Sequence, residues 1–501
     1  MKLKWILNQC RYRQLLGSDQ AEVTGLRCDS RAVSHGDAFF AIAGGTVDGH
    51  DYVSEAVAAG ASVVFIERLI ECGPEVTRVL VDDCRVAVAC VAQAFYDDPT
   101  HGWPVVGVTG TNGKTTITYL VESILQKSGQ RPAVVGTINC RFGSQCLPVA
   151  HTTPDPLWLM ETLCRFRRDG ARSLVMEVSS HALDQHRVDG IHFGVGVFTN
   201  LTPEHLDYHR DMDHYFRSKS RLFHELLSVG PGQKVINIDD PYGRRLAELC
   251  PEVLTCSCRA PASIWFRQLE LSLSGIRGRV ATPAGEVDVV SRLLGDYNAE
   301  NLLCAIGAGV ALGLAPTVIS QGIAELEGVP GRLQSVANNR EAVILVDYAH
   351  TGDALRRVLE TVQQLGPGRI LTVFGCGGDR DAGKRPVMAE AAARLSTLAI
   401  ATSDNPRSED PQAILEDVRR GLEQVHPREL SLREARDGDD RGYVVIPDRR
   451  EAIRFAVGLL RPNDLLLVAG KGHEDYQILA SGRIHFDDRE ELRLALAAGE
   501  I

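Results

Sequence analysis

The sequence predicts an α/β protein of three domains: a small N-terminal α/β domain, a central domain with a parallel sheet, and a C-terminal Rossmann-like doubly wound domain. The chain has 501 residues, and at about 150 residues per domain this length suggests roughly three cores. Its 44% hydrophobic and 24% charged residues are typical of globular proteins. Short apolar runs alternate with helical stretches along the whole chain, as expected for sheets covered by helices.

Residues 1–98 form the first predicted domain. The apolar runs 38–42 and 61–66 predict strands, and the segment 52–59 between them predicts a helix. The block ends at Asp97-Asp98-Pro99-Thr100, whose composition is typical of a turn. We therefore place the first domain boundary there.

Residues 99–331 and 332–501 form the second and third predicted domains. Both contain apolar runs separated by helical stretches, which favours parallel strands joined by crossover helices. The predicted strands of the second domain are 105–108, 173–176, 194–198 and 234–238. Those of the third domain are 342–346, 370–374, 398–401 and 464–468.

Composition also predicts the compartment. The thirteen cysteines include no C-x-x-C pair, so we expect free thiols in a reducing, cytoplasmic setting. The N-terminal apolar run is too short for an export signal. Residues 302–315 are apolar but predict a buried core helix, because a membrane span needs about 20 residues. The formal net charge of −11 argues against a general nucleic-acid binder, and we expect a soluble monomer without stable membrane association.

The clearest motif is Gly110-Thr111-Asn112-Gly113-Lys114-Thr115-Thr116, between a predicted strand and a predicted helix. Glycines let backbone N–H groups face phosphate oxygens, Lys114 reaches the terminal phosphates, and Thr115 offers its hydroxyl to Mg²⁺. The strict G-x-x-x-x-G-K-[ST] pattern is not met, because Val108 stands in the place of its first glycine. A shorter loop beginning at Gly110 serves the same purpose, so we predict a P-loop-type ATPase domain.

Acidic and histidine side chains follow later strands of this domain. Glu177 ends the strand 173–176. Alone it would be taken for a solvated acid, but beside a phosphate loop it becomes a candidate Mg²⁺ ligand. His205 and His209 are four residues apart, as in a helical zinc pair, yet the glutamate of H-E-x-x-H is missing. We favour a role for His205 beside the nucleotide metal, with an ordinary loop histidine as the alternative.

Three polar segments follow predicted strands of the third domain. In 374–380 Arg380 occupies the third glycine position of G-x-G-x-x-G, which argues against a dinucleotide site. In 403–407 Pro406 stiffens the loop, and Arg407 offers a planar fork suited to a carboxylate. The third segment is 469–474. Because parallel strands end at one edge of a sheet, the three loops predict a binding crevice.

The phosphate loop together with 177–181, 199–201 and 346–350 resembles the Mur ligases, cytoplasmic ATP-dependent amide-bond ligases of peptidoglycan synthesis. The resemblance covers nearly the whole chain. Residues 404–407 resemble the signature of members that add diaminopimelate rather than lysine. The resemblance implies that meso-2,6-diaminopimelate is joined to the D-Glu γ-carboxylate of UDP-N-acetylmuramoyl-L-Ala-D-Glu through an acyl phosphate. ATP is the implied co-substrate, Mg²⁺ the implied cofactor, and closure of the domains over the intermediate is expected.

The resemblance also implies roles for individual residues. The implied contacts with the UDP-N-acetylmuramoyl-dipeptide are Cys28, Ser30, Gly45, Thr46, Val47, His151, Thr152, Thr153, Ser179, Gln185 and Arg187. Those with ATP are the loop residues 110–116, Asn298 and Arg332. Those with diaminopimelate are Arg380, Asp404, Asn405, Pro406, Arg407, Gly470 and Glu474. The implied catalytic group is Lys114, Glu177, His205 and Lys219.

Lys219 has two interpretations. From the residues alone it is a solvated surface lysine. The resemblance implies instead that it is carbamylated to N6-carboxylysine, which would join Thr115, Glu177 and His205 as a metal ligand.

Three rival functions stay open. The same reaction with L-lysine is one. A folylpolyglutamate-synthase-type ligase is a second, although it is not expected to carry the N-terminal block or the 404–407 signature. A non-enzymatic nucleotide-binding regulator is the third, and it predicts erosion at Lys114, Glu177, His205 or Lys219, all of which are present.

Overall fold

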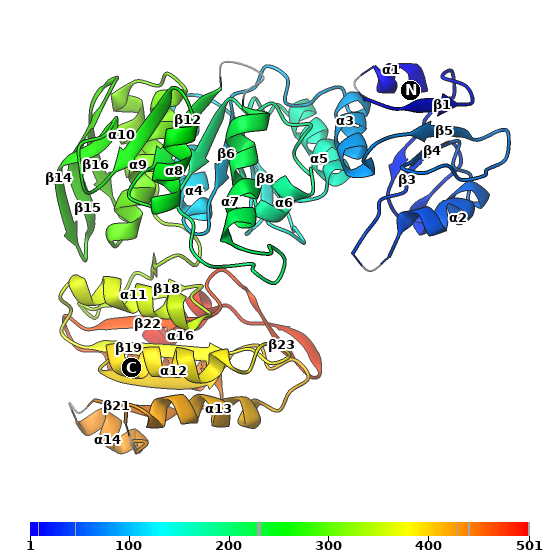
Figure 1. Ribbon diagram of the computed structural model, residues 1–501. Helices are drawn as coiled ribbons and strands as arrows, with labels where there is room; N and C mark the ends of the chain where they lie inside the picture. Colours follow the sequence, from blue (N-terminus) through cyan, green and yellow to red (C-terminus); the bar gives the residue numbers. More distant parts are fainter. Residues whose placement is uncertain (9, 46, 228–231, 427, 439–440, 499–501) are drawn as a thin grey trace. The chain divides into compact units, whose positions relative to one another are not determined.

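The computed structural model describes residues 1–8, 10–45, 47–227, 232–426, 428–438 and 441–498 (Figure 1). The chain divides into two compact units. The first consists of Met1–Arg267, Arg279–Asp288 and Glu300–Ile323, and the second of Gln268–Gly278, Val289–Ala299 and Ala324–Ile501.

The first unit begins with a five-stranded sheet in the order β1-β5-β4-β3-β2. Its strands are β1 (Gln14–Leu16), β2 (Leu26–Arg27), β3 (Ala38–Phe40), β4 (Val63–Ile66) and β5 (Thr77–Leu80). The pairs from β2 to β5 are parallel, and β1 is antiparallel to β5. The predicted strands and the helix at 52–59, observed as α2 (Val53–Ala58), are confirmed.

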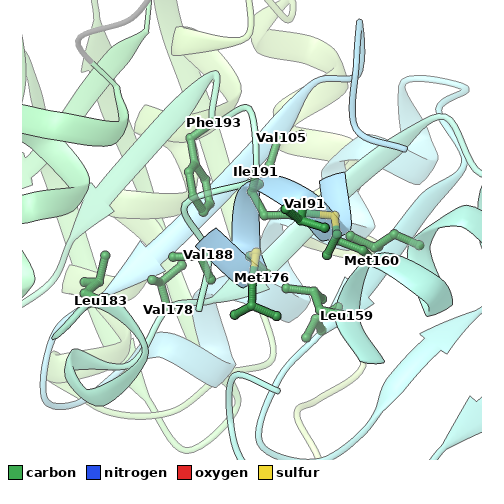
Figure 2. Packing of buried hydrophobic residues seen from close by; sticks show 14 of the residues in the cluster. Val91, Val105, Leu159, Met160, Met176, Val178, Leu183, Val188, Ile191 and Phe193 are labelled. Atoms are coloured by element: carbon green, nitrogen blue, oxygen red, sulfur yellow. The ribbon is translucent and has the colours of Figure 1, made fainter. Parts of the chain in front are cut away.

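Helix α3 (Cys84–Phe95) joins this region to the central part of the unit. Asp83 caps the helix by accepting a hydrogen bond from the Arg85 N–H. Buried residues of α3 pack in one core with α5 (Pro156–Arg168) and with strands of the large sheet. Figure 2 shows this core, in which Val91 of α3 lies near Met160 of α5.

The large sheet has eleven strands in the order β16-β15-β14-β13-β12-β11-β6-β10-β7-β8-β9. The pairs from β13 to β7 are parallel, as predicted. These strands are β6 (Val105–Thr109), β7 (Pro132–Val135), β10 (Ser173–Glu177), β11 (Val195–Phe198), β12 (Gln233–Asn237) and β13 (Val253–Ser257). The sequence did not predict β7 and β13, nor the outer strands β8 (Cys140–Phe142), β9 (Gln145–Leu147), β14 (Ile264–Ser272), β15 (Gly275–Thr282) and β16 (Gly285–Ser291).

The core helix expected at 302–315 has different limits. Helix α9 runs from Asp296 to Ala311, and α10 (Pro316–Glu325) begins after a turn. Gly313 in that turn has φ +73°, a conformation that glycine adopts readily and that ends the helix. Among the helices that the structure describes, none is both long and apolar enough to cross a membrane.

The second unit contains a six-stranded sheet in the order β17-β18-β22-β19-β20-β21. Its strands are β17 (Gln334–Ser335), β18 (Val343–Asp347), β19 (Ile370–Cys376), β20 (Leu398–Ser403), β21 (Gly442–Val445) and β22 (Leu465–Ala469). All pairs are parallel except that of β17 with β18.

Helices cover both faces of this sheet. Leu345 and Leu467 lie in one core with residues of α11 (Gly352–Gln364), α12 (Lys384–Leu395) and α13 (Pro411–Glu423). Their strand neighbours Ile344 and Leu466 lie in a second core with α15 (Arg449–Gly458) and α16 (Asp488–Ala498). Successive side chains of a strand point to opposite faces, so the predicted doubly wound arrangement is confirmed.

Candidate active site

The phosphate loop connects β6 to α4 (Lys114–Lys127). Gly110 has φ +146° and Gly113 has φ +86°. A Cβ atom at Gly110 would collide with the Thr199 hydroxyl, and one at Gly113 would collide with the Asn301 side-chain oxygen. Both positions therefore require glycine.

Residues after the neighbouring strand β11 hold this loop in place. The Thr111 N–H donates to the Asn200 carbonyl at 2.9 Å, and the Asn112 N–H donates to Asn200 Oδ1 at 2.9 Å. Lys114 Nζ donates to the carbonyls of Gly110 at 2.9 Å and Thr111 at 2.8 Å. The ammonium thus lies over the loop, where it can reach phosphate oxygens bound by the backbone N–H groups.

Glu177 is buried at the carboxyl end of β10, with 1% of its surface exposed. Its Oε1 accepts hydrogen bonds from Thr115 Oγ1 at 3.0 Å and from the Thr137 N–H at 2.9 Å. Its Oε2 accepts one from Thr137 Oγ1 at 2.9 Å. The alternative of a solvated acid is wrong. Thr137 was not among the predicted site residues, although it follows the apolar run of β7, which pairs with β10.

Lys219 lies on α7 (Met212–Arg221) and is only 1% exposed, so the alternative of a surface lysine is wrong. Its Nζ donates to the Gly110 carbonyl at 2.9 Å and lies 4.7 Å from the centre of the Tyr215 ring. Burial, and secondarily the positive charge of Lys114, hold the pKa of Lys219 well below its usual range. Both causes favour the uncharged form of this amine beside the phosphate loop.

His205 lies in a loop and not on a helix, because its φ of +57° is incompatible with helical backbone and α7 begins only at Met212. The helical zinc pair is therefore wrong. Partial burial lowers the pKa of His205, and the neighbouring Lys219 and Lys114 act in the same direction. His209 is fully buried, and its Nε2 lies 2.9 Å from Ser180 Oγ.

Residues assigned to the muramoyl peptide form a hydrogen-bonded group around Glu177. Thr153 Oγ1 donates to the Glu177 carbonyl at 2.8 Å and accepts from the Ser179 N–H at 3.0 Å. Arg187 donates to the Thr153 carbonyl at 2.9 Å and to Gln185 Oε1 at 3.1 Å.

Two further predicted contacts flank this group. Thr152 Oγ1 lies 3.0 Å from Thr137 Oγ1, and His151 is exposed next to it in the chain.

The other described residues assigned to this substrate lie in segments that follow strands β2 and β3 of the N-terminal sheet. Ser30 is buried at the start of a short 3₁₀ helix (Ser30–Ala32). Cys28 and Val47 are exposed, and the space beside Gly45 is open. Thr46 lies outside the described residues.

In the second unit, the loops after β19, β20 and β22 lie together as predicted, because these three strands are parallel neighbours. Lys471 Nζ donates to Asp404 Oδ1 at 3.1 Å and to Asn405 Oδ1 at 3.0 Å. Asn405 Nδ2 donates to Glu474 Oε2 at 3.0 Å. Lys471, which was not among the predicted site residues, is fully buried and joins the polar groups of two loops.

The other predicted residues of these loops have different environments. Arg407 has φ +54°, and its Nη1 donates to the Gly378 carbonyl at 2.7 Å. Pro406 is buried and Arg380 is exposed. Gly470 has φ +114°, and a Cβ there would lie 2.8 Å from Asp404 Oδ2, so this position also requires glycine.

The two predicted nucleotide contacts outside the phosphate loop belong to the second unit. The Arg332 guanidinium lies 5.3 Å from the centre of the Tyr348 ring, within range of a cation–π interaction. Asn298 is buried on α9, and its Nδ2 donates to the Leu294 carbonyl at 2.7 Å.

Comparison with known proteins agrees with this arrangement. Three family models match: the Mur ligase family catalytic domain over 22–96, the Mur ligase middle domain over 108–309, and the Mur ligase glutamate ligase domain over 331–472. A UDP-N-acetylmuramoyl-L-alanyl-D-glutamate–2,6-diaminopimelate ligase of Geobacter metallireducens is 51% identical, covering 96% of this chain and 95% of that one. The ligase of the same name from Oceanobacillus iheyensis is 40% identical over 99% of both chains.

Solved structures extend the comparison. One of a UDP-N-acetylmuramoyl-L-alanyl-D-glutamate–2,6-diaminopimelate ligase has a TM-score of 0.71 and 34% identity, covering 96% of each chain. A folylpolyglutamate synthase of Mycobacterium tuberculosis has a TM-score of 0.57 at 16% identity and covers 77% of this chain and 92% of its own. That second likeness concerns the fold alone. The family models and the full-length relatives together show that this chain belongs to the Mur ligase family.

Proposed function

We propose that this chain is an ATP-dependent ligase that joins meso-2,6-diaminopimelate to the D-Glu γ-carboxylate of UDP-N-acetylmuramoyl-L-Ala-D-Glu. Relatives of 40–51% identity over nearly the whole chain carry the name of that ligase. The structural observation that carries the proposal is the grouping around the phosphate loop. Lys114 and Lys219 both donate to the Gly110 carbonyl, and Thr115 donates to Glu177.

The N-terminal domain, 1–98, and the central domain, 99–331, hold the muramoyl substrate and ATP in this proposal, and the C-terminal domain, 332–501, holds the amino acid. The γ-carboxylate of D-Glu attacks the γ-phosphorus of ATP, ADP leaves, and an acyl phosphate forms. The ammonium of Lys114 neutralises charge that develops on the transferred phosphoryl oxygens. Asn298 and Arg332 are proposed as further contacts with ATP.

An amine of diaminopimelate then attacks the acyl carbon. The resulting tetrahedral intermediate expels inorganic phosphate, and the attacking nitrogen loses a proton as the amide forms. This sequence needs no protein nucleophile.

Lys219 is proposed to react with carbon dioxide. The uncharged amine forms an N–C bond to CO₂ and releases one proton, which leaves an anionic carbamate. The lowered pKa of Lys219 favours this reaction, because only the unprotonated amine has the lone pair that attacks.

The donor set fits Mg²⁺, which prefers oxygen ligands. Glu177 contributes a buried carboxylate hydrogen-bonded to the Thr115 hydroxyl. The residues proposed to hold the ion are Thr115, Glu177, His205 and carbamylated Lys219. When bound, Mg²⁺ offsets negative charge on the phosphate oxygens.

Diaminopimelate carries two carboxylates and two amines. Arg380 and Arg407 are proposed to meet its carboxylates, because a guanidinium fork matches carboxylate geometry. Asp404 and Glu474 are proposed to meet an amine, with Asn405, Pro406 and Gly470 shaping the site. We further propose that the enzyme is a monomer. We also propose that it works in the cytoplasm, since all thirteen cysteines are free thiols.

The test is ATP-dependent phosphate release with UDP-N-acetylmuramoyl-L-Ala-D-Glu, comparing meso-diaminopimelate with L-lysine at matched concentrations. We expect turnover with diaminopimelate and little with lysine. Preference for lysine would keep the ligase and reject the specificity assigned to Arg407. Absence of turnover with both would reject the ligase in favour of a nucleotide-binding regulator.

Replacing Lys114 with Ala is the matched negative control. We expect its rate of phosphate release to fall by about 10²- to 10³-fold, with an unchanged circular dichroism spectrum. Near-normal activity in this variant would contradict the proposed role of the loop.

A further inference from the structure

A second group of metal-ligating side chains lies outside the proposed active site, where the chain leaves the N-terminal sheet. Asp98 and His101 follow α3, and His192 precedes β11. One ligand atom of each residue lies within 4.8 Å of the other two. Asp98 Oδ2 is 2.9 Å from His192 Nε2 and 3.6 Å from His101 Nδ1. We propose that Asp98, His101 and His192 bind a transition-metal dication, with Zn²⁺ as the expected occupant.

Backbone hydrogen bonds hold the three residues in place. The Asp98 N–H donates to the Gln93 carbonyl at 2.8 Å, and the His101 N–H donates to the Asp98 carbonyl at 3.1 Å. The His192 N–H donates to Thr100 Oγ1 at 3.3 Å, and Thr100 is fully buried. These bonds therefore hold the three side chains close together, although His192 lies 94 positions after Asp98 in the chain.

The neighbours of His192 in the chain also fix its direction. Ile191 and Phe193 are buried in the hydrophobic core shown in Figure 2, and they alternate with His192, whose side chain is 53% exposed. Because its flanking side chains are anchored inward, the imidazole of His192 is directed away from that core. It meets Asp98 at the surface, where an ion can enter from water.

The hydrogen bonds inside the group conflict with one another. His192 Nε2 lies 2.7 Å from Gln93 Nε2 and 2.9 Å from Asp98 Oδ2. If Nε2 carries a proton, it can donate to Asp98 but faces another donor at Gln93; without a proton, it can accept from Gln93 but faces an acceptor at Asp98. Asp98 Oδ1 is also buried without a hydrogen-bond partner. A cation resolves the conflict at Nε2, because the Nε2 lone pair and Asp98 Oδ2 can then point at the same positive charge.

The spacing and chemistry favour zinc. Ligand atoms at about 2.0–2.2 Å from a tetrahedral Zn²⁺ lie about 3.4 Å from each other, and the distances of 2.9 and 3.6 Å from Asp98 Oδ2 lie on either side of that value. Two imidazoles with one carboxylate suit Zn²⁺ and its neighbours better than Mg²⁺ or Ca²⁺, which prefer oxygen atoms. Water completes the fourth position.

The test uses the full-length, chelator-treated protein. Zn²⁺ is titrated in competition with a chromogenic chelator, and Co²⁺ is used as a probe because its visible absorption reports tetrahedral nitrogen and oxygen ligands. The central variant is His101→Ala, whose imidazole is 77% exposed, so that its removal leaves the fold intact. His192→Ala removes the second imidazole, and His35→Ala is the control, because His35 is an exposed histidine outside the group.

We expect His101→Ala and His192→Ala each to weaken binding of one equivalent of Zn²⁺ by about tenfold or more, while His35→Ala binds like the original chain. Metal held by His205 and its neighbours is common to all variants and cancels in the comparison. Equal Zn²⁺ binding in His101→Ala, His35→Ala and the original chain would overturn the proposal. Ligase activity in Mg²⁺ should be the same in His101→Ala, so failure here is separable from failure of the proposed function.

Discussion

Lys471 offers the sharpest test of how the second unit builds its polar loops. Its ammonium is fully buried and lies 3.1 Å from Asp404 Oδ1 and 3.4 Å from Glu474 Oε2. The isosteric change Lys471→Met keeps the volume of the side chain but removes its charge. Asp404, which is itself buried, then loses its positive partner in a low-dielectric environment.

The size of the effect follows from this burial. Removing one partner of a buried ion pair costs about 3–5 kcal/mol, because the other charge is left uncompensated. A domain of 150–250 residues loses about 2–4 °C of melting temperature per kcal/mol. Lys471→Met should therefore lower the melting transition of the second unit by about 6–20 °C. It should also raise the KM for diaminopimelate more than the KM for ATP, because the proposed amino-acid contacts lose their support.

Differential scanning calorimetry of the full chain measures the first effect, and initial rates measure the second. Lys384→Met is the matched control, since Lys384 is an exposed lysine at the start of α12 and its loss should change the transition little. The double variant Lys471→Met with Asp404→Asn should lose less than the sum of the two single variants, because the uncompensated charge is gone. A decrease in melting temperature as small as that of Lys384→Met would refute the reasoning.

Three further predictions concern the first unit. Dialysis of the enzyme in CO₂-free buffer should lower the rate of phosphate release, and added bicarbonate should restore it. The activity of Lys219→Ala should not change under either treatment. If the activity of the original chain does not change either, the carbamate is rejected. Gly113→Ala should raise the KM for ATP and lower the melting temperature, because Gly113 has φ +86° and an added Cβ collides with the Asn301 side chain. The control Gly129→Ala has φ +81° and open space around the Cβ, so it should cost only the backbone strain of about 1–2 kcal/mol. Equal effects of the two variants would contradict the role of the collision. Burial, with secondary repulsion from neighbouring histidines, lowers the pKa of His209 from 6.5 to about 4. As the pH decreases, the unfolded chain therefore binds a proton at His209 before the folded chain does, and the stability should fall between about pH 6.5 and pH 4. If the melting temperature of His209→Gln depends on pH in the same way as that of the original chain, this prediction is contradicted.

Sequence patterns were enough to predict features that depend only on residues close together in the chain. The apolar run before Gly110 and the glycines after it predicted a strand, a phosphate loop and a helix, because each needs only a few neighbouring residues. The meeting of the loops that contain Asp404 and Glu474 also followed, because parallel strands end at one edge. By contrast, strands β14, β15 and β16 were missed, since their exposed faces carry no continuous apolar run.

The sequence could not predict which charged side chains are buried. Helix α7 carries Lys219 one residue from Ser218 and Ser220, a polar surrounding that predicts exposure. Its burial comes from the phosphate loop, 109 residues earlier in the chain. Thr137 was likewise missed, because its role depends on the pairing of β7 with β10.

Lys219 and Lys471 show why residue type alone does not fix chemistry. Both are fully or almost fully buried, and both lie in loops or helices at the carboxyl edge of a parallel sheet. Lys471 lies between two carboxylates, which stabilise its positive charge and make it a structural cation. Lys219 instead donates to a carbonyl and lies near a second lysine, so its uncharged form is favoured. The first lysine therefore holds a site together, whereas the second is free to react, and the difference is set by partners that only the fold brings to them.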